Sequence, residues 1–395
     1  MMNRFPISFW SFSLLIVLLG ILSSCSNPRS SKDGSQHETG VESWPITVNI
    51  YVENSGSMAG FCNVLDQGAI ETLVRDYYDR FDENPEINRI GLNFINTSIE
   101  SSNLGIKEFT NSIKRKCTAS YTKLNEMLEI MADSIKSNRV NIFISDCGFT
   151  SNDGNLAIAA SGITSQFSRQ LNKKDFAVAI YKYMVNFDGK YYPGAIPENK
   201  PLPLYVWVFG NKANVQKVTE LPYNSKNSGT FFLQKPTEVT YKLLPKSSRM
   251  IKDGNICVSK WKKDRYGDFY ELSFVARLDE VLLSKEKILD VSRYNIQTDN
   301  STKYEIVNIE EDRSEDYSYK FTIRSVDSNP APGRLRISYP IQTPGWVAKS
   351  NFEGSGIPPY GTTFGVSYLI EGVAKAFENT SKNNNFFVIN ISFVK

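Results

Sequence analysis

Apolar residues follow two different periods in the first half of the chain. Short apolar segments rich in β-branched residues, such as Thr47 to Val52 and Leu204 to Phe209, have the length of buried strands. Between them, apolar residues recur every three or four positions, as from Ile70 to Phe81, which is typical of amphipathic helices. Strands that alternate with helices indicate a doubly wound, mostly parallel sheet covered on both faces. We therefore predict an α/β domain over residues 45–222, with a tight hairpin turn at Asp188-Gly189.

The pattern changes after residue 222. Residues 223–236 are polar and rich in turn formers, and strand-like segments separated by turn residues then dominate. These segments are Phe269–Ala276, Tyr304–Ile309, Tyr319–Arg324, Arg334–Tyr339 and Phe386–Val394. A single helical segment, from about Ser367 to Glu378, interrupts them. We predict that residues 223–395 form a β-rich, sandwich-like second domain with one helix.

The first residues have the pattern of an export signal. Arg4 precedes an apolar segment, Phe12 to Leu22, that is short for a membrane-spanning helix and suits a secretory signal. The following Leu22-Ser23-Ser24-Cys25 resembles the bacterial lipobox, which implies a lipoprotein signal peptide over residues 1–24 and lipidation of Cys25. Residues 25–44 are polar and predict a flexible tether. The expected location is the bacterial cell envelope, with a lipid anchor in a membrane; the alternative is an ordinary signal peptide with a chance cysteine.

Charge and histidine content exclude several classes of function. The net charge is only +3, from 45 basic and 42 acidic residues, which argues against nucleic acid as the partner. The one histidine, His37, lies in the predicted tether. The folded part therefore offers no histidine for a zinc site or for a Ser-His-Asp triad.

Oxygen-bearing side chains gather just after the first predicted strand. Glu53, Ser55 and Ser57 occupy alternate positions where this strand ends. In an open α/β sheet, the loops at the carboxyl ends of strands line the ligand crevice. Carboxylate and hydroxyl oxygens suit a hard divalent cation such as Mg²⁺. The stretch predicts a cation site at this sheet edge.

The same stretch resembles the first motif of the von Willebrand factor A-like family, Asp-x-Ser-x-Ser, with Glu53 in place of the aspartate. Two later stretches match the family in order and approximate spacing: a loop that offers Thr122 before a helix, and a strand that ends in Asp146. The resemblance covers residues 45–222. It implies a metal-ion-dependent adhesion site with Glu53, Ser55, Ser57, Thr122 and Asp146 around Mg²⁺, or Mn²⁺ or Ca²⁺, and a partner protein that offers a carboxylate to the metal.

Cys62 and Cys117 fall in loops at the same end of the predicted sheet. An oxidising compartment permits their pairing, so we predict a disulfide between them; the alternative is that all cysteines are free thiols.

Three functional hypotheses follow from the sequence. The first is a cell-envelope lipoprotein that binds a partner protein through the divalent cation and is not an enzyme. The second is a metal-free, degenerate scaffold for envelope assembly. The third and least favoured is a hydrolase that uses Asp146 or a Ser-Lys arrangement.

Overall fold

The computed structural model describes residues 45–395 with interruptions at 63–67, 121, 151–153, 192–195, 220–226, 246–249, 264–269, 313, 315, 328–329, 355–357 and 382–383. The predicted signal peptide (1–24), the tether (25–44) and Cys25 lie outside the described residues. Within these ranges, no helix has both the length and the apolar character needed to cross a membrane.

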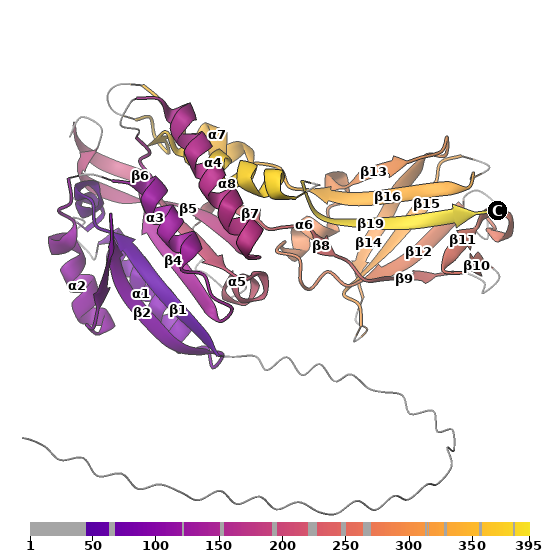
Figure 1. Ribbon diagram of the computed structural model, residues 1–395, viewed down its shortest axis with the longest axis horizontal. Helices are drawn as coiled ribbons and strands as arrows, with labels where there is room; N and C mark the ends of the chain where they lie inside the picture. Colours follow the sequence, from indigo (N-terminus) through magenta and orange to yellow (C-terminus); the bar gives the residue numbers. More distant parts are fainter. Residues whose placement is uncertain are drawn as a thin grey trace, which may run out of the picture. The chain divides into compact units, whose positions relative to one another are not determined.

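A seven-stranded sheet with helices on both faces forms the first part of the fold (Figure 1). Its strands lie in the order β3-β2-β1-β4-β6-β5-β7. Strands β2, β1 and β4 run parallel to one another, whereas every other pairing in this sheet is antiparallel. The elements in chain order are β1 (Ile46–Glu53), η1 (Gly56–Cys62), α1 (Ala69–Asp82), β2 (Ile87–Ile95), β3 (Ile99–Ser102), α2 (Ile106–Lys116), α3 (Leu124–Asp133), β4 (Arg139–Ser145), α4 (Leu156–Lys173), β5 (Ala177–Tyr191), β6 (Ile196–Gly210), α5 (Lys212–Thr219) and β7 (Asn227–Leu233).

The α/β class is thus confirmed, but the prediction of a mostly parallel sheet needs correction. Strands β5 and β6 form one long hairpin, in which Asp188 pairs with Asn199 and Gly189 with Glu198. The Asp-Gly pair therefore lies inside a strand, and the predicted tight turn there is wrong. Pairing along fifteen residues of each strand outweighs a local turn preference. Strand β6 lies between β5 and β4 and runs antiparallel to both.

Strand residues sort by alternation into two cores, one on each face of the sheet. In β6, Val206 and Val208 face the helices α1, α2 and α5, whereas Tyr205 and Trp207 belong to the core beneath α3 and α4. Coverage of both faces explains why these strands are almost continuously apolar.

Two further sheets form the β-rich part. The six-stranded sheet has the order β10-β11-β19-β16-β13, with β8 also paired to β19, and the four-stranded sheet has the order β14-β15-β12-β9. Aromatic rings join them: Tyr304 of β14 stacks on Phe393 of β19 at 5.2 Å between ring centroids. The remaining elements are β8 (Thr237–Glu238), β9 (Tyr241–Leu244), β10 (Ile251–Lys252), β11 (Asn255–Cys257), η3 (Val258–Lys260), β12 (Tyr270–Ala276), α6 (Lys285–Leu289), η4 (Val291–Arg293), β13 (Asn295–Thr298), β14 (Tyr304–Glu311), β15 (Tyr319–Ser325), β16 (Gly333–Pro340), α7 (Gly345–Lys349), β17 (Asn351–Phe352), β18 (Thr363–Phe364), α8 (Val366–Thr380) and β19 (Asn385–Val394).

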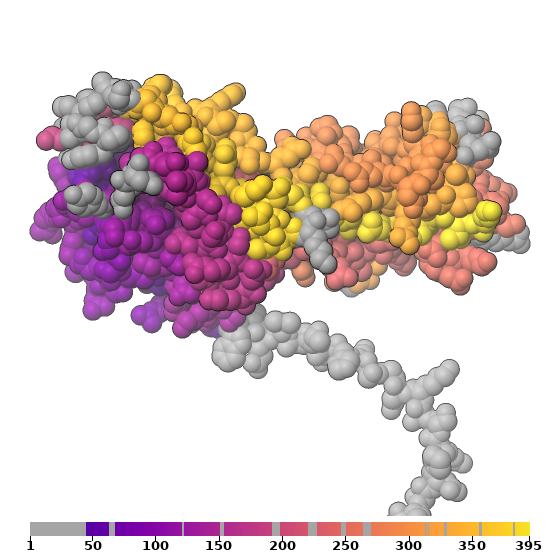
Figure 2. All heavy atoms as spheres, turned by 45° about the horizontal axis from the view of Figure 1, so that its top comes forward, coloured from indigo at the N-terminus to yellow at the C-terminus, as the bar shows by residue number. Residues whose placement is uncertain are grey.

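The predicted domain boundary at residue 222 also needs correction, because the chain returns to the α/β part twice. Strand β7 completes the seven-stranded sheet, and α8 lies along α4 (Figure 1). On the surface, the yellow atoms of the α8 region border the magenta atoms of the α4 region (Figure 2). Thr164 of α4 donates a hydrogen bond to the carbonyl of Gly372 in α8 at 2.9 Å. The predicted helix exists, but it packs on α4, and its Phe377 lies 5.7 Å from Phe176 between ring centroids.

The close approach of α4 and α8 depends on Gly372. A Cβ atom at this position would lie 2.9 Å from the carbonyl oxygen of Ala160, a backbone atom that has little room to move. Gly162, in the interior of α4, is exposed and has no atom near its missing Cβ. The two glycines therefore form a matched pair.

We expect Gly162→Ala to raise the free energy of unfolding by about 1 kcal/mol, the gain in helix propensity. Gly372→Ala should instead lower the free energy of unfolding by roughly 1–2 kcal/mol, because the cost of overpacking against Ala160 is larger than the gain in helix propensity. Urea denaturation of the two variants measures both values. Equal stabilisation by both substitutions would contradict the described helix contact.

Candidate functional site

Three loops meet at one edge of the seven-stranded sheet. Strands β1 and β4 are parallel neighbours with Val52 beside Ile144, so Glu53 and Ser145 follow at the same level. The loop before α3 joins them through two backbone hydrogen bonds. Gly56 donates its N–H to the carbonyl of Ala119 at 2.9 Å, and Ala119 donates to the carbonyl of Asn54 at 3.1 Å.

A chain of hydroxyl groups connects the two carboxyl groups of this site. Thr122 donates to Oε1 of Glu53 at 3.0 Å, and Ser145 donates to Oε2 of the same side chain. Ser55 also hydrogen-bonds Glu53, and its Oγ lies 3.1 Å from Oγ of Ser57. Ser57 in turn hydrogen-bonds Asp146. The fold thus brings together all five side chains that the sequence singled out.

Ser145 is the residue of this network that the sequence analysis missed. Besides bonding Glu53, its Oγ accepts the N–H of Cys147 at 2.8 Å and so shapes the turn after β4. Cys147 has a φ of +54°, which an L-residue seldom adopts. A signal was available: once β1 and β4 are taken as parallel neighbours, the residue before Asp146 falls beside Glu53.

Burial makes this pair of carboxyl groups difficult to ionise. Glu53 is fully buried, and desolvation together with the nearby Asp146 raises its pKa to about 7, against the lowering effect of its hydroxyl donors. Desolvation also raises the pKa of Asp146, although Ser57 and the N–H of Gly148 donate to it. Within the described ranges, neither carboxylate forms an ion pair with a lysine or arginine.

Counting protons shows what the network lacks. The path Glu53–Ser55–Ser57–Asp146 contains three hydrogen-bond contacts. The two serine hydroxyls supply only two protons to these contacts, because ionised carboxylates are acceptors alone. A third proton, held by Glu53 or Asp146, would complete the path. The ionised form of the site is therefore short of one proton or of a cation.

The donor set fits a hard divalent cation. Its carboxylates and hydroxyls offer oxygen alone, and a hydroxyl that donates its proton to a carboxylate still has lone pairs for a metal. The buried Oδ1 of the adjacent Asn54 also has no hydrogen-bond donor in the part of the chain that is described. The same part contains no cluster of three or more His, Cys, Asp or Glu side chains, so a cation here would need the hydroxyl oxygens as ligands.

Two stretches from the C-terminal quarter, residues 345–354 and 358–365, lie near the same edge of the sheet. Phe364 accepts the N–H of Phe149, in the loop after Asp146, at 2.8 Å. Phe364 also donates its own N–H to the hydroxyl of Tyr191 at 3.0 Å. Gly365 follows with a φ of +68°, and a Cβ there would lie 2.4 Å from the carbonyl of Phe149. The strand-rich sequence pattern predicts this part of the chain in the second domain, whereas its contacts are with the α/β part.

A buried lysine holds both of these stretches on strand β5. Nζ of Lys182 donates to Oγ of Ser350 and to the carbonyl of Gly361, each at 2.7 Å. Desolvation lowers the pKa of Lys182. Ser350 is fully buried and donates its own hydroxyl proton to the carbonyl of Trp346 at 2.6 Å. The contacts of this Ser-Lys pair therefore hold residues near Ser350 and Gly361 against strand β5.

The cysteines of the predicted disulfide lie next to each other. Cys62 and Cys117 are free thiols that hydrogen-bond each other, and this contact together with burial raises the pKa of Cys62. The thiol of Cys117 also donates weakly to the backbone carbonyl of Glu53, with 3.9 Å between Sγ and the oxygen. Their disulfide stays a prediction.

Comparison of the chain with protein-family models, with curated proteins and with solved structures gave no match.

The raised pKa of Glu53 predicts how stability depends on pH. Between about pH 4.5 and 7 the folded chain keeps a proton on Glu53 that the unfolded chain has lost. The free energy of unfolding should therefore fall as pH rises through this window, by roughly 3 kcal/mol. Urea denaturation in the presence of EDTA, repeated across this range, measures the slope.

Glu53→Gln should flatten that slope, because an amide does not titrate. The exposed Glu83→Gln is the matched control and should retain it. A wild-type stability that stays constant or rises between pH 5 and 7 would contradict the assignment of a shared buried proton to this site.

Proposed function

We propose that the chain is a cell-envelope lipoprotein whose α/β part is a von Willebrand factor A-like domain with a divalent-cation site for a partner protein. The hydroxyls of Ser55, Ser57 and Thr122 and the carboxylates of Asp146 and Glu53 would hold Mg²⁺. The bound cation would supply a Lewis-acidic position for a carboxylate of the partner.

One observation carries this proposal: two buried carboxyl groups share a hydroxyl network that has no basic partner. Burial of paired charges is tolerated when a counter-charge is present, and here the described residues provide none. A divalent cation would neutralise both carboxylates and would accept the free lone pairs of three hydroxyls. The meeting of three loops at the ends of parallel strands supports the same interpretation.

The location rests on the sequence. The apolar segment before Leu22-Ser23-Ser24-Cys25 supports export, lipidation of Cys25 and a tether over residues 25–44. A lipid-anchored domain on a tether can reach a partner protein near the membrane surface. The balanced net charge favours a protein over a nucleic acid as this partner.

A metal-free scaffold is the second candidate, and a specific observation favours it. Glu53 is fully buried, and both of its oxygens already accept hydroxyl protons, from Thr122 and Ser145. A carboxyl group that keeps its proton would close this network without a metal. In that case the α/β part would bind its partner through its surface alone.

Calorimetric titration of Mg²⁺ and Mn²⁺ into the soluble chain from residue 40 onward separates the two candidates. We expect saturable binding at pH 8, accompanied by a rise in melting temperature, because a ligand that binds only the folded state stabilises it. The Ser55→Ala, Asp146→Asn double variant should lose both effects.

Asp79→Asn, an exposed substitution of the same type on α1, is the control and should bind as the parent does. The double variant must also melt cooperatively, which shows that it is folded. Absence of heat and of thermal stabilisation in the parent would reject the metal site and leave the scaffold as the conclusion.

A further inference from the structure

A cavity lies among residues that are distant along the chain from the loops around Glu53 and Asp146. Its volume is about 360 Å³, within the range of small-molecule pockets. Strand β7 contributes Phe232, the short helices α6 and η4 contribute Lys287 and Arg293, and β16 contributes Tyr339. Among the residues that line it are two cations and no carboxylate.

Among the described residues, no carboxylate pairs with Lys287 inside this cavity. Nζ of Lys287 lies 5.0 Å from the centroid of the Phe232 ring, a cation–π distance. Desolvation and the positive charge of Arg293 lower the pKa of Lys287, and only the exposed Glu286 acts in the opposite direction. An anion in the cavity would offset both the desolvation of Lys287 and its repulsion from Arg293.

Arg293 is paired on one side and has further donors. Its Nε donates to Oδ2 of Asp290 at 2.9 Å, and Asp290 is not among the residues that line the cavity. A guanidinium group has five N–H donors, so this contact leaves others for a ligand or for Tyr339. The hydroxyl of Tyr339 donates to the carbonyl of Lys287 at 3.2 Å and so fixes the ring against α6.

We propose that this cavity binds a small organic anion with a flat apolar body. The carboxylate or phosphate group of the ligand would lie between Lys287 and Arg293, and its body would pack against the partly exposed ring of Phe232. Such a site places one strong polar anchor beside apolar walls, the usual composition of a small-molecule pocket. It is independent of the cation proposed above.

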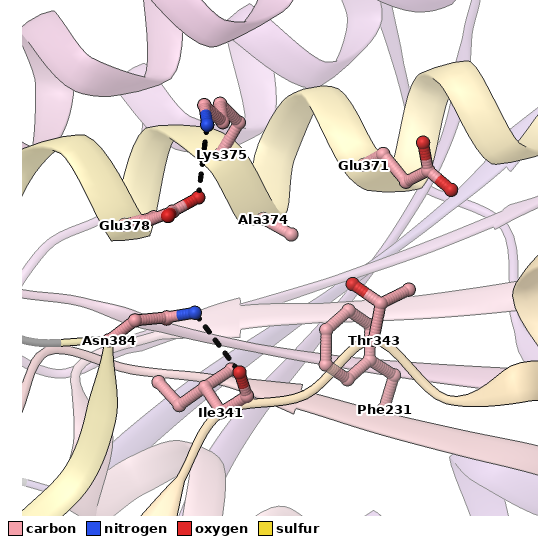
Figure 3. A pocket seen from close by; sticks show the side chains of 8 residues that line it. All are labelled: Phe231, Ile341, Thr343, Glu371, Ala374, Lys375, Glu378 and Asn384. Atoms are coloured by element: carbon pink, nitrogen blue, oxygen red, sulfur yellow. Dashed lines mark hydrogen bonds and ion pairs between the residues drawn. The ribbon is translucent and has the colours of Figure 1, made fainter.

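An adjacent cavity provides an internal comparison (Figure 3). It has a volume of about 230 Å³ and shares Phe231 and Thr343 with the first cavity. Its charged residues are Glu371, Lys375 and Glu378, of which Lys375 and Glu378 form an ion pair at 3.3 Å. With two acids and one base, this second cavity should not hold an anion.

The test is calorimetric titration of phenyl phosphate into the full folded chain. EDTA is included, so that a carboxylate- or phosphate-binding metal cannot contribute. We expect saturable binding, whereas benzyl alcohol, which has the body without the charge, should show none. Inorganic phosphate, which has the charge without the body, should bind at least about tenfold more weakly.

Lys287→Gln and Arg293→Gln should each weaken phenyl phosphate binding by at least about tenfold, the effect of losing one charged hydrogen bond. Lys375→Gln removes the same charge from the adjacent cavity and should leave the affinity unchanged. Absence of phenyl phosphate binding by the parent would overturn the proposal. So would equal binding of phenyl phosphate and benzyl alcohol, a comparison that does not depend on any variant.

Discussion

The fold buries two carboxyl groups close together, and no lysine or arginine of the described residues forms an ion pair with either of them. Glu53 ends a buried strand and Asp146 follows its parallel neighbour, so the sheet itself sets their proximity. Four hydroxyls, from Ser55, Ser57, Thr122 and Ser145, are oriented around them. These hydroxyls lower the cost of ionisation but cannot remove it, since they bring no charge. Whatever neutralises this pair, a proton or a divalent cation, also determines how the three loops are held together.

The surroundings of the site link it to the rest of the molecule. Residues 358–365 contact the loop after Asp146 through Phe149, and Lys182 of β5 holds Ser350 and Gly361 by hydrogen bonds. The stretch at 358–365 leads directly into α8, which lies on α4. The chain then continues into β19, a central strand of the six-stranded sheet. Backbone hydrogen bonds and one helix therefore join the loops around Glu53 and Asp146 to the β-rich part.

Sequence patterns were sufficient for the α/β class, for most helices and for all five side chains proposed around the cation. These follow from local signals: periodicity, and hydroxyl or acidic residues where a strand ends. The sheet direction was not predictable in this way, because the choice between a crossover and the long β5–β6 hairpin depends on pairing between distant residues. The return of α8 to α4 was hidden for the same reason, since its amphipathic pattern specifies a buried face but not the surface that covers it. Ser145 was missed because its role depends on the parallel register of β1 and β4.

The buried pair requires either a proton or a cation, and the number of protons released when Mg²⁺ binds distinguishes these two states. Calorimetric titrations in buffers of different ionisation enthalpy give this number, because a metal that binds the deprotonated ligands displaces their protons. With the pKa of Glu53 at about 7, we expect close to one proton released per Mg²⁺ at pH 6 and almost none at pH 8.5. Mg²⁺ binding without proton release at pH 6 would show that Glu53 holds no proton for the metal to displace.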